Sequence, residues 1–218
     1  QNFPSGTHIL PAEYYVADVS TPGNFSWRRT HQVSFDELDH IQEVEAENSQ
    51  KVTYLWFTPA TSISTQTLGL PLAKVINASN DQVAYTSFEA PKDGSVSGTD
   101  ILEDGAWEIV RTAAAGWVSH DPTLIQSGIN GFHLANKGAG NERYVRKRNL
   151  PAGKYKVSFW HKGDPVNVSA TGQSPKYTSA HNGLEMQYQE FEVQIAAGGT
   201  VEVSCSQNAY IDELRLYP

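Results

Sequence analysis

The sequence is poor in sulfur, with one cysteine and one methionine among 218 residues. A single cysteine, Cys205, excludes an intrachain disulfide and any zinc site built from several cysteines. It follows Val201 and Val203 in an alternating run, so we expect either a small buried residue or a residue on the face of a strand. Cysteine chemistry therefore supplies no candidate site.

The sequence is also short of positive charge and of long apolar runs. Sixteen Lys and Arg residues stand against 24 Asp and Glu residues, which gives a formal net charge of −8. No excess of cations is present to neutralise phosphate groups, so neither a nucleic acid nor an anionic membrane surface is expected as a partner. No apolar run approaches the roughly 18 residues of a membrane-spanning helix, and we expect no membrane insertion.

Catalytic signatures are missing as well. The sequence contains no Gly-x-Ser-x-Gly elbow, no His-Glu-x-x-His motif, no P-loop and no Gly-x-Gly-x-x-Gly motif. Glu185, Glu190 and Glu192 offer a possible carboxylate pair for glycoside hydrolysis. Exposed strands carry such acidic pairs routinely, however. We therefore expect a protein that is not an enzyme by itself.

Aromatic residues are abundant, with five Trp and ten Tyr. Aromatic side chains favour pleated sheets, so most of these rings are expected to pack within strands, and the remainder are free to stack on a ligand. The run from Tyr155 to Trp160 shows the pattern, because Tyr155, Val157 and Phe159 alternate with more polar residues. No apolar pattern of helical period exceeds two turns in the C-terminal part. The sequence predicts an all-β fold.

The alternating runs fall into two groups. Residues 32–35, 41–45 and 52–56 have the spacing of a β-meander, and later runs have that of a β-sandwich. Within the sandwich, we expect residues 143–147 to pair with 154–162, and 186–195 with 200–204, as hairpins. The predicted organisation is an extended lead-in over 1–30, a short β-meander over 31–76, a linker over 77–82 and a β-sandwich over 83–218.

Three segments of the second group resemble a known family. They are Thr86-Ser-Phe-Glu89, the strand that follows Leu150-Pro-Ala-Gly153, and Ile211-Asp-Glu-Leu-Arg-Leu216. Together they resemble the β-jelly-roll carbohydrate-binding modules of galactose-binding type. The resemblance implies a jelly roll that binds a polysaccharide or another glycan in a secreted or cell-surface protein.

The preceding part resembles a second family. The aromatic-Asp turn at Phe35-Asp36 and the strands after it look like the segment of Bacteroidetes RHS/YD-repeat-associated proteins that leads into an embedded jelly roll. The sequence departs from that pattern over residues 57–67. This resemblance implies that the remainder of an RHS-repeat protein is a partner. Only about one YD repeat is present, and repeat architectures need several stacked units, so the chain alone cannot close a shell.

The resemblance to carbohydrate-binding modules also implies a structural Ca²⁺ ion. In those modules, the acid after the opening aromatic residue and the aspartate of the closing strand hold the metal, and these positions are Glu89 and Asp212 here. Calcium prefers several oxygen ligands, and the first and last strands of a jelly roll lie close together. The alternative is that both residues are ordinary acids at the ends of exposed strands.

A sugar-binding surface needs aromatic planes flanked by polar groups. If Phe159 and its alternating neighbours face the core, Trp160 and Lys162 face outward, and Tyr144 and Arg146 do so on the preceding strand if Val145 points inward. The alternative is that another segment covers Trp160. Two functions stay open, a carbohydrate-binding module and a structural module that binds its neighbours and no sugar. The predicted sugar platform comprises Tyr144, Arg146, Trp160 and Lys162.

Overall fold

The structure of the chain is a computed structural model. It is built almost entirely from antiparallel strands, and within the described residues the only helices are two short 3₁₀ turns, η1 (Asn80–Gln82) and η2 (Pro122–Leu124). None of the described helices is long and apolar enough to cross a membrane. The all-β fold predicted from the alternation is confirmed. The structure describes residues 13–21, 24–35, 40–56, 71–89, 99–112, 118–135, 142–171, 177–178 and 185–218.

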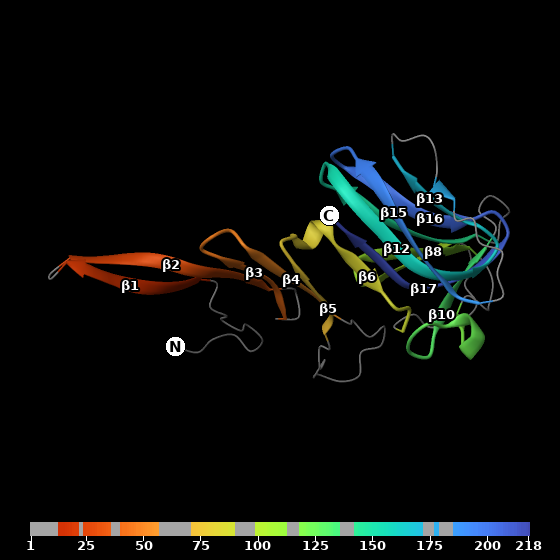
Figure 1. Cartoon of the computed structure of the whole chain (residues 1–218), viewed down its shortest axis with the longest axis horizontal. Helices are drawn as coiled ribbons and strands as arrows, with labels where there is room; N and C mark the ends of the chain where they lie inside the picture. The colour runs from red at the N-terminus through yellow and green to blue at the C-terminus, as the bar shows by residue number, and fades with distance from the viewer. Residues whose placement is uncertain are drawn as a thin grey trace.

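The N-terminal part is a five-stranded antiparallel meander whose strands pair in chain order. Figure 1 shows this sheet extending from the sandwich along the long axis of the molecule, with the β1–β2 hairpin at its far end. The sheet begins at Glu13, so residues of the expected lead-in already belong to it. Its strands are β1 (Glu13–Thr21), β2 (Asn24–Phe35), β3 (Ile41–Ala46), β4 (Lys51–Trp56) and β5 (Pro71–Ile76).

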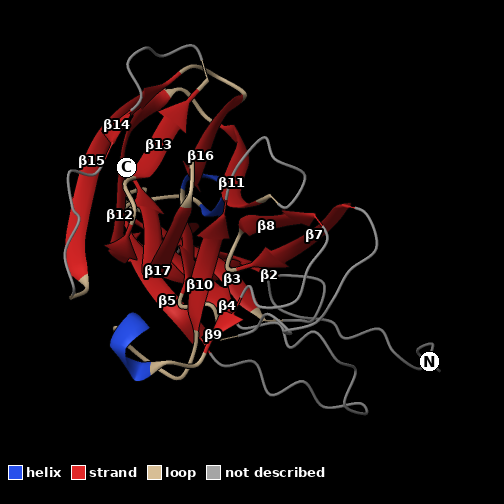
Figure 2. Cartoon of the chain, turned by 90° about the vertical axis from the view of Figure 1, so that its right-hand side faces the viewer, coloured by secondary structure: helices blue, strands red, loops and turns tan. Residues whose placement is uncertain are grey.

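The second part is a sandwich formed by one antiparallel sheet that curls on itself. Its halves, β14–β13–β16–β11 with β7 and β8, and β15–β12–β17–β10 with β6 and β9, are joined by the single pair Ala135 and Arg143. Figure 2 shows β15 and β12 on one side and β8 and β7 on the other. The strands are β6 (Ala84–Thr86), β7 (Thr99–Asp104), β8 (Trp107–Thr112), β9 (Val118–Ser119), β10 (Gly131–Ala135), β11 (Arg143–Leu150), β12 (Gly153–Gly163), β13 (Val166–Ala170), β14 (Tyr177–Thr178), β15 (Gln187–Ile195), β16 (Gly199–Cys205) and β17 (Asn208–Tyr217).

The apolar residues of both halves meet in one core. Trp107 of β8, Phe159 of β12 and Ile211 of β17 are fully buried there, and the rings of Phe88 and Phe132 stack with centroids 5.1 Å apart. Because strand residues alternate between faces, burying one set directs the other set outward. Cys205 belongs to this core, so the first of the two alternatives for the lone cysteine is the one observed.

Two predicted hairpins are wrong. β11 pairs with β8 and β16, whereas β12 pairs with β15 and β17, so the turn at residues 151–152 carries the chain from one half of the sandwich to the other. Leu150 is fully buried in the core beside this turn, and the Tyr155 hydroxyl donates to the Pro151 carbonyl oxygen at 3.0 Å. In the same way, β15 and β16 lie in opposite halves.

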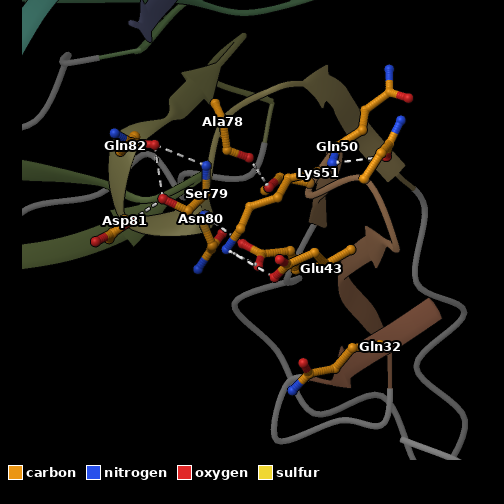
Figure 3. Close-up of polar contacts among 12 residues, drawn as sticks. Gln32, Glu43, Gln50, Lys51, Ala78, Ser79, Asn80, Asp81 and Gln82 are labelled. Atoms are coloured by element: carbon orange, nitrogen blue, oxygen red, sulfur yellow. Dashed lines mark hydrogen bonds and ion pairs between the residues drawn. The ribbon is translucent and has the colours of Figure 1, made fainter. Parts of the chain in front are cut away.

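The residues between the two parts form an ordered joint. The Thr53 hydroxyl donates to the Ala78 carbonyl oxygen at 2.6 Å, and the Asn80 N–H donates to Glu43 Oε2 at 3.3 Å. Lys51 Nζ lies 2.8 Å from Glu43 Oε1 and holds that carboxylate in place (Figure 3). On the apolar side of the joint, Leu55 packs with Ala78 and Val83. The polar linker expected over residues 77–82 is therefore fixed to the meander.

Leu55→Ala is expected to lower the free energy of unfolding by about 2 to 3 kcal/mol, because it removes a buried side chain from the joint and leaves a cavity. Denaturant unfolding of the 218-residue chain measures this. The matched control is Ile76→Ala on the adjacent strand, where the side chain is 56% exposed and the expected change is below about 0.5 kcal/mol. Equal losses in the two variants would contradict the packing described.

Candidate functional site

The outer face of the half formed by β15, β12 and β17 carries a group of aromatic side chains. Tyr155, Val157, Phe159 and His161 of β12 are buried, so the intervening residues point away from the core. The register places Tyr188 of β15 opposite Trp160, and Tyr210 of β17 opposite Lys162. We call this surface the aromatic face; its rings are Tyr85, Trp160, Tyr188, Tyr210 and Tyr217.

Trp160 and Tyr188 form the most exposed pair of the aromatic face. Their ring centroids lie 5.7 Å apart with the planes inclined by 60°. Tyr188 is 43% exposed and Trp160 is half-buried, so neither ring is covered completely. Farther along the face, the Tyr210 ring stacks on His133 of β10 with centroids 4.5 Å apart. The outward orientation of Trp160 agrees with the alternation in the sequence.

Glu190 fixes two of the rings. Its Oε2 accepts hydrogen bonds from the hydroxyls of Tyr188 at 3.0 Å and Tyr217 at 2.8 Å, and its Oε1 lies 2.8 Å from Lys156 Nζ. The hydrogen bond from Lys156, followed by those from Tyr217 and Tyr188, lowers the pKa of Glu190 to about 2. Burial and the hydrogen bond to this carboxylate raise the pKa of Tyr217 to about 12. The hydroxyls of Tyr188 and Tyr217 are thus hydrogen-bonded to a Glu190 carboxylate that stays ionised.

A β-bulge in β17 places two consecutive acids on the outer side. Ile211 and Leu214 both face the core, three residues apart instead of two, and the register with β12 shifts at this point. Glu213 has a φ of 53°, in the left-handed region. Asp212 and Glu213 therefore both reach toward the loop at residues 120–130.

Three carboxylates hold this loop. Asp212 Oδ2 accepts hydrogen bonds from the Gln126 and Ser127 N–H groups, both at 2.8 Å, and Glu213 accepts one from the Ser127 hydroxyl. Glu89 Oε1 accepts the Ile129 N–H at 2.9 Å and the Asn130 N–H at 3.0 Å. The structure therefore brings Glu89 and Asp212 to the same loop, as the predicted metal site required.

Gly128 lets the Glu89 carboxylate approach the backbone of the loop at residues 120–130. Its φ is 67°, and a Cβ at this position would lie 2.1 Å from Glu89 Oε1. Any side chain would therefore be strained by the backbone conformation and would also collide with the carboxylate. Glu89 can therefore bind the loop only because position 128 is a glycine.

The calcium site predicted at Glu89 and Asp212 coincides with these hydrogen bonds to the loop. Calcium takes six to eight oxygen ligands, whereas three oxygens of these two carboxylates already accept backbone N–H groups, including Asp212 Oδ1 from Glu213 at 2.7 Å. Across the described residues, no three His, Cys, Asp or Glu side chains gather into a metal-ligating group. Burial raises the pKa of Asp212, although the N–H donors of Ser127 and Gln126 oppose the rise. The carboxylates act on the loop directly.

Glu213 links the loop to a second aromatic position. The Tyr85 hydroxyl lies 3.0 Å from both Glu213 oxygens, Arg215 Nη2 lies 2.7 Å from Oε2, and the guanidinium sits 5.8 Å from the Tyr85 ring centroid. Burial alone would raise the pKa of Glu213, but the hydrogen bonds from Ser127, Arg215 and Tyr85 outweigh it and lower that pKa. Burial and the adjacent Glu213 charge raise the pKa of Tyr85 to about 12.

The loop borders the aromatic face at the Trp160 end. Lys162 Nζ donates to the Thr123 carbonyl oxygen at 3.1 Å, so this predicted residue fastens the loop to β12. Asp121 caps η2 by accepting the Thr123 N–H at 2.8 Å. A pocket of about 480 Å³ lies within the loop; its lining residues are His120, Pro122, Ile125, Gln126, Ser127, Gly128 and Ile129.

The predicted four-residue platform does not form, because β11 and β12 are not neighbours. Val145 faces the shared core, so Tyr144 and Arg146 point outward from the half opposite to that of Trp160 and Lys162. Arg146 Nε lies 2.8 Å from Glu108 Oε2, within an ion-pair cluster that includes Arg148. The structure keeps Trp160 beside Lys162 and separates both from Tyr144 and Arg146.

Glu190 and Glu192 do not have the properties of a glycosidase pair. A general acid needs a raised pKa, whereas the pKa of Glu190 is lowered to about 2. Glu192 is largely exposed and lies 3.4 Å from Lys154 Nζ. Glu190 therefore does not have the raised pKa of a general acid.

Tyr188, Tyr217 and Glu190 complete the aromatic face but were not among the predicted binding residues. The signal for Tyr188 is present in the sequence: Val193 and Ile195 are apolar at odd positions, so the even positions 188, 190 and 192 face the opposite way. That β15 lies beside β12, however, is a property of the topology alone.

No protein-family model matches the sequence, and no match was found among curated proteins. Similar folds occur among solved structures. One is the CBM22-1–GH10 region of Clostridium thermocellum endo-1,4-β-D-xylanase 10B, complexed with xylohexaose, with 13% identity and a TM-score of 0.38. The match covers 62% of the present chain and 28% of that chain.

Two isolated modules are also similar. A family 35 carbohydrate-binding module from Clostridium thermocellum shares 17% identity with a TM-score of 0.32, over 62% of the present chain and 98% of the module. A carbohydrate-binding module of Cellvibrio mixtus lichenase 5A, in complex with cellotriose, shares 13% identity with a TM-score of 0.27, over 46% of the present chain and 95% of the module. The likeness concerns the β-sandwich alone.

Asp212→Ala is expected to lower the free energy of unfolding by about 2 to 4 kcal/mol, because three backbone N–H groups lose their acceptor near the core. Chemical denaturation measures the loss. Glu192→Ala, at an exposed acid on the same side of the sandwich, is the control and should change stability by less than about 0.5 kcal/mol. Comparable effects of the two substitutions would show that the loop does not depend on Asp212.

A calcium ion bound through Glu89 and Asp212 stays a prediction, and it requires that calcium raise the melting temperature although oxygens of both residues accept N–H groups. Melting curves recorded with CaCl₂ and with EGTA test this directly. A cation bound to the folded state at about 100 times its Kd would add roughly 2.7 kcal/mol and shift the curve by several degrees. A calcium-dependent rise that disappears in Asp212→Ala would confirm the metal site predicted from the sequence, and a melting curve that calcium and EGTA leave unmoved would contradict it.

Proposed function

We propose that the chain is a non-catalytic module that binds a glycan on the aromatic face, in a secreted or cell-surface protein. The observation that supports this most is the partly exposed Trp160–Tyr188 pair on adjacent strands. Sugar rings present apolar C–H faces that stack on aromatic planes, while their hydroxyls need polar groups beside them. Lys156 and Glu190 supply such groups next to Tyr188.

Tyr188 and Tyr217 suit this role because their side chains are already held in place before a ligand binds. Tyr188 and Tyr217 are held through their hydroxyls by one carboxylate, and Lys156 holds that carboxylate. A ligand that stacks on a ring already fixed in place loses less affinity to the ordering of side chains. The rings lie along adjacent strands, so the ligand we infer is a chain of sugars lying along the face.

Trp160→Ala and Tyr188→Ala are each expected to reduce glycan affinity about tenfold, because each removes an aromatic plane worth roughly 1.4 kcal/mol. The ligand is first found on a glycan array, and affinities are then measured by calorimetry. Trp27→Ala is the matched control, since that ring is 70% exposed but lies on β2 of the meander. Binding that survives both face substitutions, or is lost in Trp27→Ala, would contradict the assignment of the face.

Glycan affinity is expected to stay constant from neutral pH down to about pH 4. The folded pKa of Glu190, about 2, lies below the ordinary glutamate value of about 4.3. Its contribution is therefore complete above the ordinary value and is lost only as the pH falls through the folded value. Calorimetric titrations at several pH values measure this, and a loss of affinity centred on the ordinary glutamate pKa would show that Glu190 is not held as described.

A second candidate is a structural module of an RHS-type shell with no glycan ligand. It is favoured by the β1–β2 hairpin, where Tyr14, Tyr15, Val16 and Trp27 are all exposed by 47 to 70%. Strand β1 is an edge of the meander, and an edge strand with exposed apolar residues is a surface for pairing with another strand. A flat response across the glycan array would favour this role over sugar binding.

A further inference from the structure

An apolar groove lies where the meander meets the sandwich. It has a volume of about 380 Å³, and its floor and walls come from both parts. The joint that forms it is fixed on its polar side by the hydrogen bonds from Thr53 to Ala78 and from Asn80 to Glu43. Ligand sites occur preferentially at such boundaries between packed units. The aliphatic lining residues are Leu55, Leu72, Ala73, Val75, Ala84 and Leu216.

The groove offers an incoming ligand few free polar groups. Tyr85 and Tyr217 border it, but the hydroxyl of Tyr85 is bound to Glu213 and that of Tyr217 to Glu190. The guanidinium of Arg215 is paired with Glu213 at 2.7 Å. A sugar placed here would meet mainly aliphatic side chains, and the loss of water from its hydroxyls against such a lining is unfavourable. The groove therefore suits an apolar group and is chemically distinct from the aromatic face.

One charge at the groove is not neutralised. Lys74 of β5 is exposed, borders the groove and makes no ion pair or side-chain hydrogen bond within the described residues. The other cation there, Arg215, is already matched by Glu213. An unmatched ammonium group beside an aliphatic cleft is complementary to a ligand with an apolar body and one negative charge.

We propose that the groove between β5, β6 and β17 binds a small amphipathic carboxylate, with its alkyl or aryl body against Leu72, Ala73 and Val75 and its carboxylate beside Lys74. The burial of the apolar body supplies most of the affinity, and Lys74 supplies the preference for an anion. The groove shares Tyr85 and Tyr217 with the aromatic face, but the charge that selects its ligand comes from Lys74, which is not part of that face.

The test uses the full 218-residue chain with octanoate as the probe, and octanamide and octylammonium as uncharged and cationic probes of equal chain length. Calorimetry should rank octanoate above octanamide and octanamide above octylammonium. Lys74→Glu should weaken the affinity for octanoate about three- to tenfold and leave the affinity for octanamide unchanged, because the substitution reverses a charge and leaves the apolar lining intact. Lys154→Glu is the control, at an exposed lysine of β12 that is not part of the groove lining, and should change neither affinity.

Ala73→Phe fills the groove and should abolish binding of both octanoate and octanamide. Because this variant could fail to fold, the unaltered chain is also titrated with octanoate by amide NMR, where the shifts should concentrate at residues 72–75, 84–85 and 215–217. Absence of binding at millimolar octanoate, shifts located elsewhere, or equal effects of Lys74→Glu on octanoate and octanamide would each overturn the proposal. None of these results depends on whether a glycan binds the aromatic face.

Discussion

The β-bulge in β17 is the constraint on which the candidate site depends. By placing Ile211 and Leu214 in the core three residues apart, it leaves two consecutive acids on the outer side of the sandwich. Asp212 then holds the loop at residues 126–127, and Glu213 holds Tyr85 and Arg215. The position of the loop beside Trp160 and the orientation of Tyr85 at the groove both follow from this one irregularity.

Carboxylates serve here as fixing points for other groups. Glu89 and Asp212 accept backbone N–H groups, Glu190 accepts two tyrosine hydroxyls, and Glu213 accepts a tyrosine, a serine and an arginine. Charged acceptors give stronger hydrogen bonds than neutral ones, so each acid restricts several neighbours at once. The acidic residues that give the chain its negative net charge have this structural use in the sandwich.

The sequence predicts where strands form and which of their side chains face the core, but it does not predict which strands lie side by side. The alternation around Val145 and Phe159 correctly predicts which side chains of β11 and β12 face the core. Cys205 is buried, which was one of the two environments expected for it. The turn after Leu150 has the residues of a hairpin, but turn chemistry does not determine which strand lies alongside. Because β12 pairs with β15 and not with β11, Tyr188 replaces Tyr144 beside Trp160. The three-residue spacing of the apolar residues Ile211 and Leu214, in place of the regular spacing of two, indicates the bulge in the sequence itself.

The central claim is that a glycan stacks on Trp160, and the indole N–H signals of the five tryptophans test it most directly. They are observed by ¹⁵N-correlated NMR while the best glycan from the array is added, with each signal assigned by substitution. The account predicts that the Trp160 signal moves in proportion to saturation and that the Trp27 signal stays in place. A stationary Trp160 signal during demonstrable glycan binding, with movement at Trp27 or Trp56, would contradict it.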